Sequence, residues 1–158
     1  MKISSAAFPD GGMMPKKCTG FGEDLSPEFT IADTPEKTAC LAIIMDDLDV
    51  PFRKSFNHWI IWNIPKTEVI PEGLPHGAIL EKPFPARQGI AWGKHRYRGP
   101  KQPFFIRGEH RYVFTVYALD CELTLTENTD RDGLLLAMEG HILAKAELMG
   151  RYGRGKGK

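Results

Sequence analysis

The stretch GEHRYVFTVYALD, residues 108–120, decides the fold, because it combines a long apolar strand with a polar start. Its residues 111–119 are mostly β-branched, aromatic or aliphatic, a composition that favours a strand. Successive side chains point to opposite faces of a strand, so one face begins with polar groups and continues with apolar ones: His110, Tyr112, Phe114, Val116 and Ala118. We expect this face to look into the core, with an imidazole and a phenol at its rim.

The stretch HWIIWNIP, residues 58–65, repeats this arrangement and stops at Pro65. The same alternation predicts one face that starts with an imidazole and continues with large apolar side chains: His58, Ile60, Trp62 and Ile64. Two strands that each begin with an inward-facing histidine predict a polar rim on an apolar cavity, which is a common form of ligand site.

Glycine and proline are frequent, with 16 and 12 copies, and they separate short apolar runs in the way typical of a mainly β domain. The further strands that we expect are CLAIIM (40–45), buried on both faces, and LTLT (123–126), which is short. The run HILAKAELMGRY (141–152) could extend the preceding helix or form a last strand after the break at Gly140, and we favour the strand. One helix is expected after a cap at Thr129 or Asp130, through RDGLLLAMEG as far as Gly140. The long Pro/Gly-rich loop 65–103 is of the kind that covers a functional site.

The 158 residues suffice for one domain, which we place at 1–152, followed by a basic, flexible tail at 153–158. A net charge of +1 argues against a nucleic-acid partner, and no apolar run is long enough to span a membrane. The three cysteines are widely spaced and form no CxxC motif, as expected in a reducing compartment. These totals predict a cytoplasmic protein.

Carboxylates gather in DDLDVP, residues 46–51, where the run CLAIIM ends. Asp47 and Asp49 are two residues apart, so they share a face if the strand continues. If it does not, they lie in the turn that Pro51 enforces, where aspartate is an ordinary turn-forming residue.

Taken together, DDLDVP…NHWIIWNIP and RGP…P…GEHRYVFTVYALD resemble the phosphatidylethanolamine-binding protein family, most closely its bacterial, Raf-kinase-inhibitor-like branch. The opening SSAAFPDGGMMP and the closing AMEGHILAKAELMGRY are similar to that branch too, so the resemblance covers nearly the whole chain. It implies an antiparallel Greek-key β-sandwich with a few short helices. It also implies a small pocket for phosphate-like anions, with no cofactor and no catalytic residue.

The resemblance assigns this pocket to seven residues, which match the family's Asp-Pro-Asp-x-Pro, histidine, Gly-Pro-Pro and His-x-Tyr motifs: Asp47, Asp49, His58, Gly99, Pro100, His110 and Tyr112. The sequence departs from the family pattern at Leu48, which replaces the proline between the aspartates. The loop GPKQPFFIRGEH is longer than the usual Gly-Pro-Pro-x-Gly segment, with Pro103 as the candidate partner proline. Its insertion FFI, residues 104–106, could partly cover the mouth of the pocket. The C-terminal helix of eukaryotic members is absent from the sequence pattern.

For the chemistry we expect His58 and His110 to be the main donors to an anion, with Asp47 and Asp49 positioning their rings. The Tyr112 hydroxyl and backbone N–H groups near Gly99 would add further donors. The expected function is non-catalytic binding of a phosphate-like small molecule or a phosphorylated protein, with regulation of a kinase or another partner as its consequence.

An alternative is a hydrolase that uses the same aspartates and histidines, with or without a divalent metal. The sequence has no HExxH and no GxSxG motif to support it. For the loop aromatics, packing of a loop and contact within a homodimer are both open interpretations: Trp92, Tyr97, Phe104 and Phe105.

Overall fold

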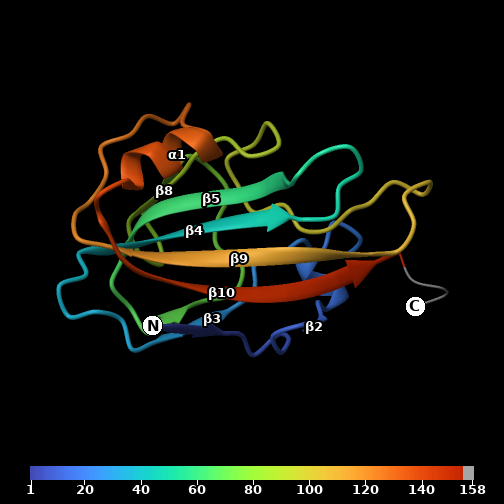
Figure 1. Ribbon diagram of the computed structural model, residues 1–158, viewed down its shortest axis with the longest axis horizontal. Coiled ribbons are helices and arrows are strands. Elements are labelled where there is room, and N and C mark those ends of the chain that lie inside the picture. The colour runs from blue at the N-terminus through green and yellow to red at the C-terminus, as the bar shows by residue number, and fades with distance from the viewer. Residues whose placement is uncertain (155–158) are drawn as a thin grey trace.

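The computed structural model describes residues 1–154 of the protein as two β-sheets with one helix on the outer face of the larger sheet (Figure 1). The smaller sheet has the strand order β1-β3-β6 and the larger one β2-β10-β9-β4-β5-β8-β7. The long strands of the larger sheet are β4 (Cys40–Asp47), β5 (Phe56–Pro65), β9 (Glu109–Leu119) and β10 (Ile142–Gly153). The short elements are β1 (Lys2–Ser4), β2 (Gly12–Met13), η1 (Lys16–Cys18), β3 (Phe29–Ala32), β6 (Val69–Ile70), β7 (Ile79–Leu80) and β8 (Ala86–Gln88), and the α-helix is α1 (Arg131–Met138).

Strand β4 is buried along its whole length, because both faces of the larger sheet are covered. Leu41, Ile43 and Met45 belong to the core cluster between the two sheets. Cys40, Ala42 and Ile44 belong to a second cluster, which α1 completes from the outer face. The expectation for CLAIIM as a strand buried on both faces is confirmed.

Strand β5 does not follow the simple alternation expected for it. Its register against β4 shifts twice, so that Met45 faces Trp59 while Asp46 faces Asn57, and His58 is the extra residue of a bulge. Ile60 and Trp62 lie in the cluster under α1, whereas Ile64 lies in the core between the sheets. The predicted common face of His58, Ile60, Trp62 and Ile64 is therefore wrong, and the bulges are the reason.

The end of the chain folds much as expected. Asp130 caps α1 by accepting a hydrogen bond from the Gly133 backbone N–H at 2.9 Å, and β10 occupies the range predicted for the last strand. The short strand expected at 123–126 is wrong. Both backbone groups of Leu123 bond instead to the side-chain amide of Asn63 (2.8 and 2.9 Å), so the segment joins no strand ladder.

The larger sheet is mixed rather than wholly antiparallel, because β2 pairs in parallel with β10 while the other neighbours are antiparallel. The strand order does not correspond to a clear Greek-key sandwich either. Of the predicted fold, the mainly β composition is confirmed and the wholly antiparallel Greek-key arrangement is not. None of the helical segments within 1–154 qualifies as a membrane span. Of the predicted flexible tail, Gly153 is the last residue of β10, and residues 155–158 lie outside the described part of the chain.

Candidate functional site

The antiparallel arrangement brings the end of β4 next to the beginnings of β5 and β9. Asp47 pairs with Tyr112 on one side and with Phe56 on the other. At this end of the sheet lies an open cavity of about 410 Å³, walled by the strand ends and by the loops before β5 and β9. Its lining residues are Asp47, Val50, Pro51, Phe52, Phe56, His58, Trp92, Lys101, Gln102, Pro103, Phe105, Ile106, His110 and Tyr112.

A buried polar contact of the cavity joins His110 to Asp47, with 2.8 Å between Nδ1 and the carboxylate oxygen Oδ2. Both side chains are almost fully buried, at 7% and 4% exposed. The carboxylate can only accept here, so Nδ1 carries the proton and the ring is held in one orientation. The second ring nitrogen, Nε2, is the one that remains for a ligand.

His58 is held by a different partner, because its Nδ1 donates to the backbone carbonyl of Arg98 at 2.6 Å. Burial lowers the pKa of His58, although the Arg98 carbonyl and the nearby Asp47 oppose this shift. A neutral ring that donates from Nδ1 presents a lone pair at Nε2. His58 therefore becomes a donor to an anion only when it takes up a proton.

Tyr112 lies between the two imidazoles, with ring centroids 5.4 Å from His58 and 6.4 Å from His110. Burial, followed by the charge of Asp47, raises the pKa of its hydroxyl. The phenol thus stays protonated and is able to donate a hydrogen bond. His58 on β5 is thus brought next to His110 and Tyr112 on β9, as expected.

Asp49 is placed outside the cavity. Its carboxylate forms a bidentate pair with the Arg111 guanidinium, at 2.9 and 3.0 Å, and it also accepts from the Arg111 backbone N–H. This pairing lowers the pKa of Asp49. Asp47 binds the backbone N–H of Asp49 at 2.8 Å, so the two aspartates form a turn that fastens the start of β9. Asp49 therefore lies in the turn after β4, the second of the two alternatives that the sequence left open, and it does not line the cavity to which the family resemblance assigned it.

Gly99 and Pro100 do not line the cavity either; they clamp the loop that carries residues 18–24. The Gly99 N–H donates to the Asp24 carboxylate at 2.7 Å, so it is not available as an anion donor. The Pro100 carbonyl accepts from the Gly20 N–H at 2.9 Å. A Cβ atom at Gly99 would collide with the Cys18 carbonyl oxygen, which explains glycine at this position.

Several residues at the site were not singled out as anion-site residues from the sequence, among them Trp92 and Lys101, which line the cavity, and Arg98 beside it. Trp92 packs edge-on against His58 at 5.2 Å and against Phe56 at 5.4 Å. Lys101 follows the Gly-Pro step and adds a positive charge to the cavity wall. The Arg98 guanidinium stacks on the Trp92 ring at 3.9 Å. The sequence could have indicated them, because one aromatic and two basic residues, Trp92, Arg98 and Lys101, lie in the single loop between β8 and β9.

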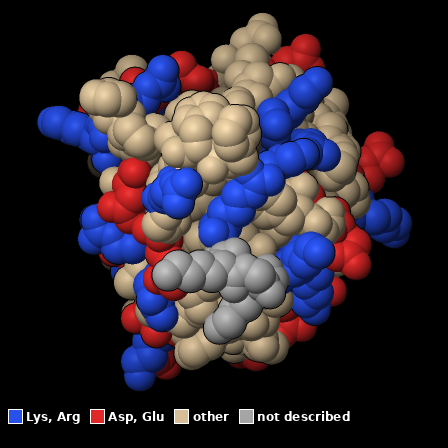
Figure 2. All heavy atoms as spheres, turned by 90° about the vertical axis from the view of Figure 1, so that its right-hand side faces the viewer, with Lys and Arg blue, Asp and Glu red and all other residues tan. Residues whose placement is uncertain are grey.

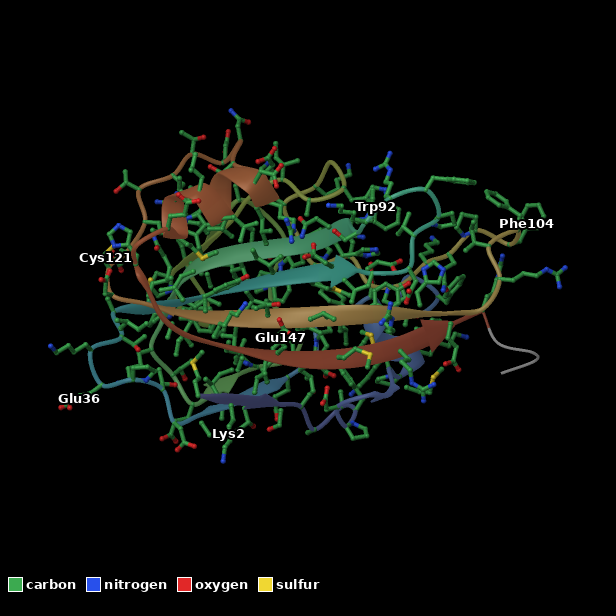
Figure 3. All side chains as sticks on the ribbon, in the orientation of Figure 1. Lys2, Glu36, Trp92, Phe104, Cys121 and Glu147 are labelled. Carbon is green, nitrogen blue, oxygen red and sulfur yellow. The ribbon has the colours of Figure 1, made fainter. Side chains whose placement is uncertain are left out.

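The inserted loop residues differ in their roles. Phe105 and Ile106 line the cavity, as expected for a partial cover, whereas Phe104 lies at the outer tip of the loop and does not (Figure 3). Phe104 is 79% exposed and Phe52, on the facing loop, is fully exposed. On this end of the molecule, Lys and Arg side chains lie around uncharged surface (Figure 2).

The fold and this cavity define a class of protein: a mainly β chain with a histidine-rimmed apolar pocket at one end of its larger sheet. Residues 4–153 match the sequence profile of the phosphatidylethanolamine-binding protein family. A UPF0098 protein of Pyrococcus abyssi is 43% identical over 155 residues, which cover 98% of this chain and 85% of that protein. The chain belongs to the phosphatidylethanolamine-binding protein family, as the resemblance predicted.

Solved structures agree with this assignment. A phosphatidylethanolamine-binding protein homologue from Chlamydia trachomatis matches with a TM-score of 0.85 at 35% identity, over 98% of this chain and 97% of its own. YbcL of Escherichia coli matches with a TM-score of 0.87 over 98% of both chains, and at 23% identity it shows the fold alone.

Proposed function

We propose that this protein binds the phosphate group of a phosphomonoester in the cavity between β4, β5 and β9, without catalysing a reaction. One observation carries the proposal: two buried imidazoles, each fixed through Nδ1 at 2.6–2.8 Å, line one cavity with their Nε2 atoms left for a ligand. The Tyr112 hydroxyl and the Lys101 ammonium group are the further donors. Charge-assisted bonds of this kind are about twice as strong as neutral ones.

The role of Asp47 in such a site is indirect. A carboxylate repels an anion, but the Asp47 carboxylate accepts a hydrogen bond from Nδ1–H of His110, which fixes the orientation of the ring and keeps Nε2 directed at the ligand. His58 lacks such a carboxylate partner and is kept neutral by burial. Anion binding is therefore expected to raise the pKa of His58 and to draw a proton from solution.

The size and lining of the cavity favour an organic phosphomonoester over inorganic phosphate. About 410 Å³ is far more than one phosphate group fills, and much of the wall is aromatic or aliphatic. Phe56, Trp92 and Phe105 would contact the organic part, while the imidazoles hold the charge. A phosphorylated side chain of a partner protein, such as a kinase, presents the same chemistry, so regulation of a partner is compatible with this site.

Isothermal titration with inorganic phosphate and with phenyl phosphate tests the proposal. We expect phenyl phosphate to bind more tightly, and His110→Gln to lose at least about tenfold in affinity, since a hydrogen bond to a charged group contributes about 1.5–3 kcal/mol. His76→Gln, which changes an exposed histidine elsewhere, is the matched control. Equal affinity of the wild type and His110→Gln would refute the proposal. A phosphoserine peptide, titrated in parallel, tests the partner interpretation.

The absence of a chemical step is tested with p-nitrophenyl phosphate. We expect the compound to compete with phenyl phosphate for the site and to release no nitrophenolate above the protein-free rate. Release that disappears in His110→Gln would instead support the hydrolase alternative. Asp49 is already paired with Arg111, which argues against it as the second carboxylate of such an enzyme.

For the location of the protein we propose the cytoplasm, because its three cysteines are free thiols, as is usual in a reducing compartment.

A further inference from the structure

A second cluster of reactive side chains lies at the opposite end of the sheet from the cavity, where β9 ends and β10 begins (Figure 3). Asp120 and Cys121 directly follow β9, and His141 directly precedes β10. The Asp120 N–H donates to the His141 carbonyl at 3.0 Å, which fixes the two backbones side by side. Their donor atoms, a carboxylate oxygen, a thiol sulfur and an imidazole nitrogen, all lie within 4.8 Å of one another.

The detailed geometry does not suit a catalytic relay. The Asp120 oxygen Oδ1 lies 2.9 Å and the Cys121 sulfur 3.4 Å from the same atom, Nδ1 of His141. A relay needs the two partners on different ring nitrogens, and one nitrogen carries at most one proton to share. Three donor atoms that converge on one point are the arrangement expected around a metal ion.

We propose that Asp120, Cys121 and His141 bind a divalent zinc-like ion, with one coordination position left for water. In a tetrahedral zinc site, bond lengths of about 2.3 Å to sulfur and 2.0–2.1 Å to nitrogen place these ligand atoms about 3.3–3.6 Å apart. The 3.4 Å between sulfur and nitrogen fits this spacing, and the 2.9 Å between oxygen and nitrogen needs only a small outward shift. The mixed sulfur, nitrogen and oxygen donor set is one that zinc favours.

The surroundings support a site that is both held in place and open to solvent. The buried Cys40 thiol contacts the Cys121 carbonyl oxygen at 3.3 Å and so holds the Cys121 backbone from the inside. The Asp120 and His141 side chains are about two-fifths exposed, which leaves an entry path for the ion. Bound metal would close the loop of residues 121–140, which carries α1, and would stabilise the folded state by linkage.

Cobalt substitution of the chelator-treated full chain tests this proposal. We expect one equivalent of Co²⁺ to bind, with a thiolate-to-cobalt charge-transfer band and the visible bands of four-coordinate Co²⁺. Cys121→Ser should remove the charge-transfer band and weaken binding at least about tenfold, the lower end of the losses seen for supporting residues. His76→Gln and His110→Gln should bind Co²⁺ as the wild type does. Equal affinity in Cys121→Ser would overturn the proposal.

Alkylation of the wild-type protein provides a readout that needs no variant at the site. Zn²⁺ should slow the reaction of iodoacetamide with Cys121 at least about tenfold, because a metal-bound thiolate is shielded. Cys18, which is buried in the core between the two sheets, serves as an internal reference in the same digest, since its alkylation would report a general opening of the fold. An alkylation rate of Cys121 that Zn²⁺ leaves unchanged would contradict the site. Neither experiment depends on anion binding at the other end of the sheet.

Discussion

Asp46 and Asp47 are neighbours at the end of β4, yet they serve opposite faces of the sheet. Asp46 accepts from Nε of Arg131 at 3.0 Å through both oxygens and thereby fastens the start of α1. Asp47 holds His110 in the cavity on the other face. The alternation of a strand thus gives two adjacent carboxylates a supporting role for the helix and a positioning role for the candidate site.

This relationship yields a matched pair of substitutions. Asp47→Asn should weaken phenyl phosphate binding at least about tenfold, because the His110 ring loses the hydrogen bond to a charged group that fixes its orientation. Asp46→Asn should leave that affinity within about twofold and instead lower the free energy of unfolding by about 1 kcal/mol, because its partner Arg131 is one-third exposed and solvent weakens the ion pair. Calorimetric titration and chemical denaturation of both variants measure these effects. The prediction fails if both variants bind alike.

Stability should depend on pH through His58. Its pKa is lowered in the folded state, so the unfolded chain binds more protons between that pKa and the unfolded value of about 6.5. The free energy of unfolding should therefore fall as the pH drops below about 6.5, and the fall should be shallower in His58→Gln. Denaturation curves over this range, without added anion, measure the difference. Equal slopes for the two proteins would contradict the assigned protonation state.

Anion affinity should have the opposite pH dependence. Sulfate is the suitable probe, since it keeps its charge where phosphate titrates. Binding should strengthen as the pH falls, because protonated His58 turns from an acceptor into a donor at Nε2. In His58→Gln this part of the pH dependence should be lost. Sulfate titrations at matched ionic strength measure it, and a pH-independent affinity in the wild type would count against the site.

The two loop phenylalanines should differ as ligand contacts. Phe105 lines the cavity and Phe104 does not, although both are exposed. Phe105→Ala should weaken phenyl phosphate by about 1 kcal/mol, the usual size of an aromatic contact beyond its burial, and leave inorganic phosphate unaffected. Phe104→Ala should change neither affinity. A loss for both ligands in Phe105→Ala would mean that the loop shapes the anion site itself.

A structural prediction concerns Asn63, which lies at the second bulge of β5 with a φ of +56°. Its amide bonds both backbone groups of Leu123. Asn63→Gly should tolerate the dihedral but lose these bonds, at about 1–3 kcal/mol. Asn63→Ala should be worse by about a further 1 kcal/mol, because alanine resists positive φ. Urea denaturation gives the free energy of unfolding of each variant. If Asn63→Ala is as stable as Asn63→Gly, the positive φ of residue 63 makes no contribution to the loss of stability.

The sequence was sufficient where alternation and composition decide the structure, as in β4, β9 and the placement of His110 beside Tyr112. The predicted common face of β5 was wrong, because a bulge adds one residue to the strand and the hydrophobic pattern does not reveal where. The bulge at His58 turns this side chain toward Tyr112. Asp49 and Gly99 match the family motif, but their partners are Arg111 and Asp24. Such pairings depend on loop positions, which no local pattern in one sequence determines.

The parallel pairing of β2 with the end of β10 has a consequence for biosynthesis. Gly12 and Met13 lie opposite Gly150 and Arg151, and the Gly11 N–H reaches the Met149 carbonyl. Contacts between such distant positions close slowly, and chains emerge from the ribosome with the N-terminus first. The segment that contains β2 therefore has no β10 partner until residues 142–153 have been synthesised.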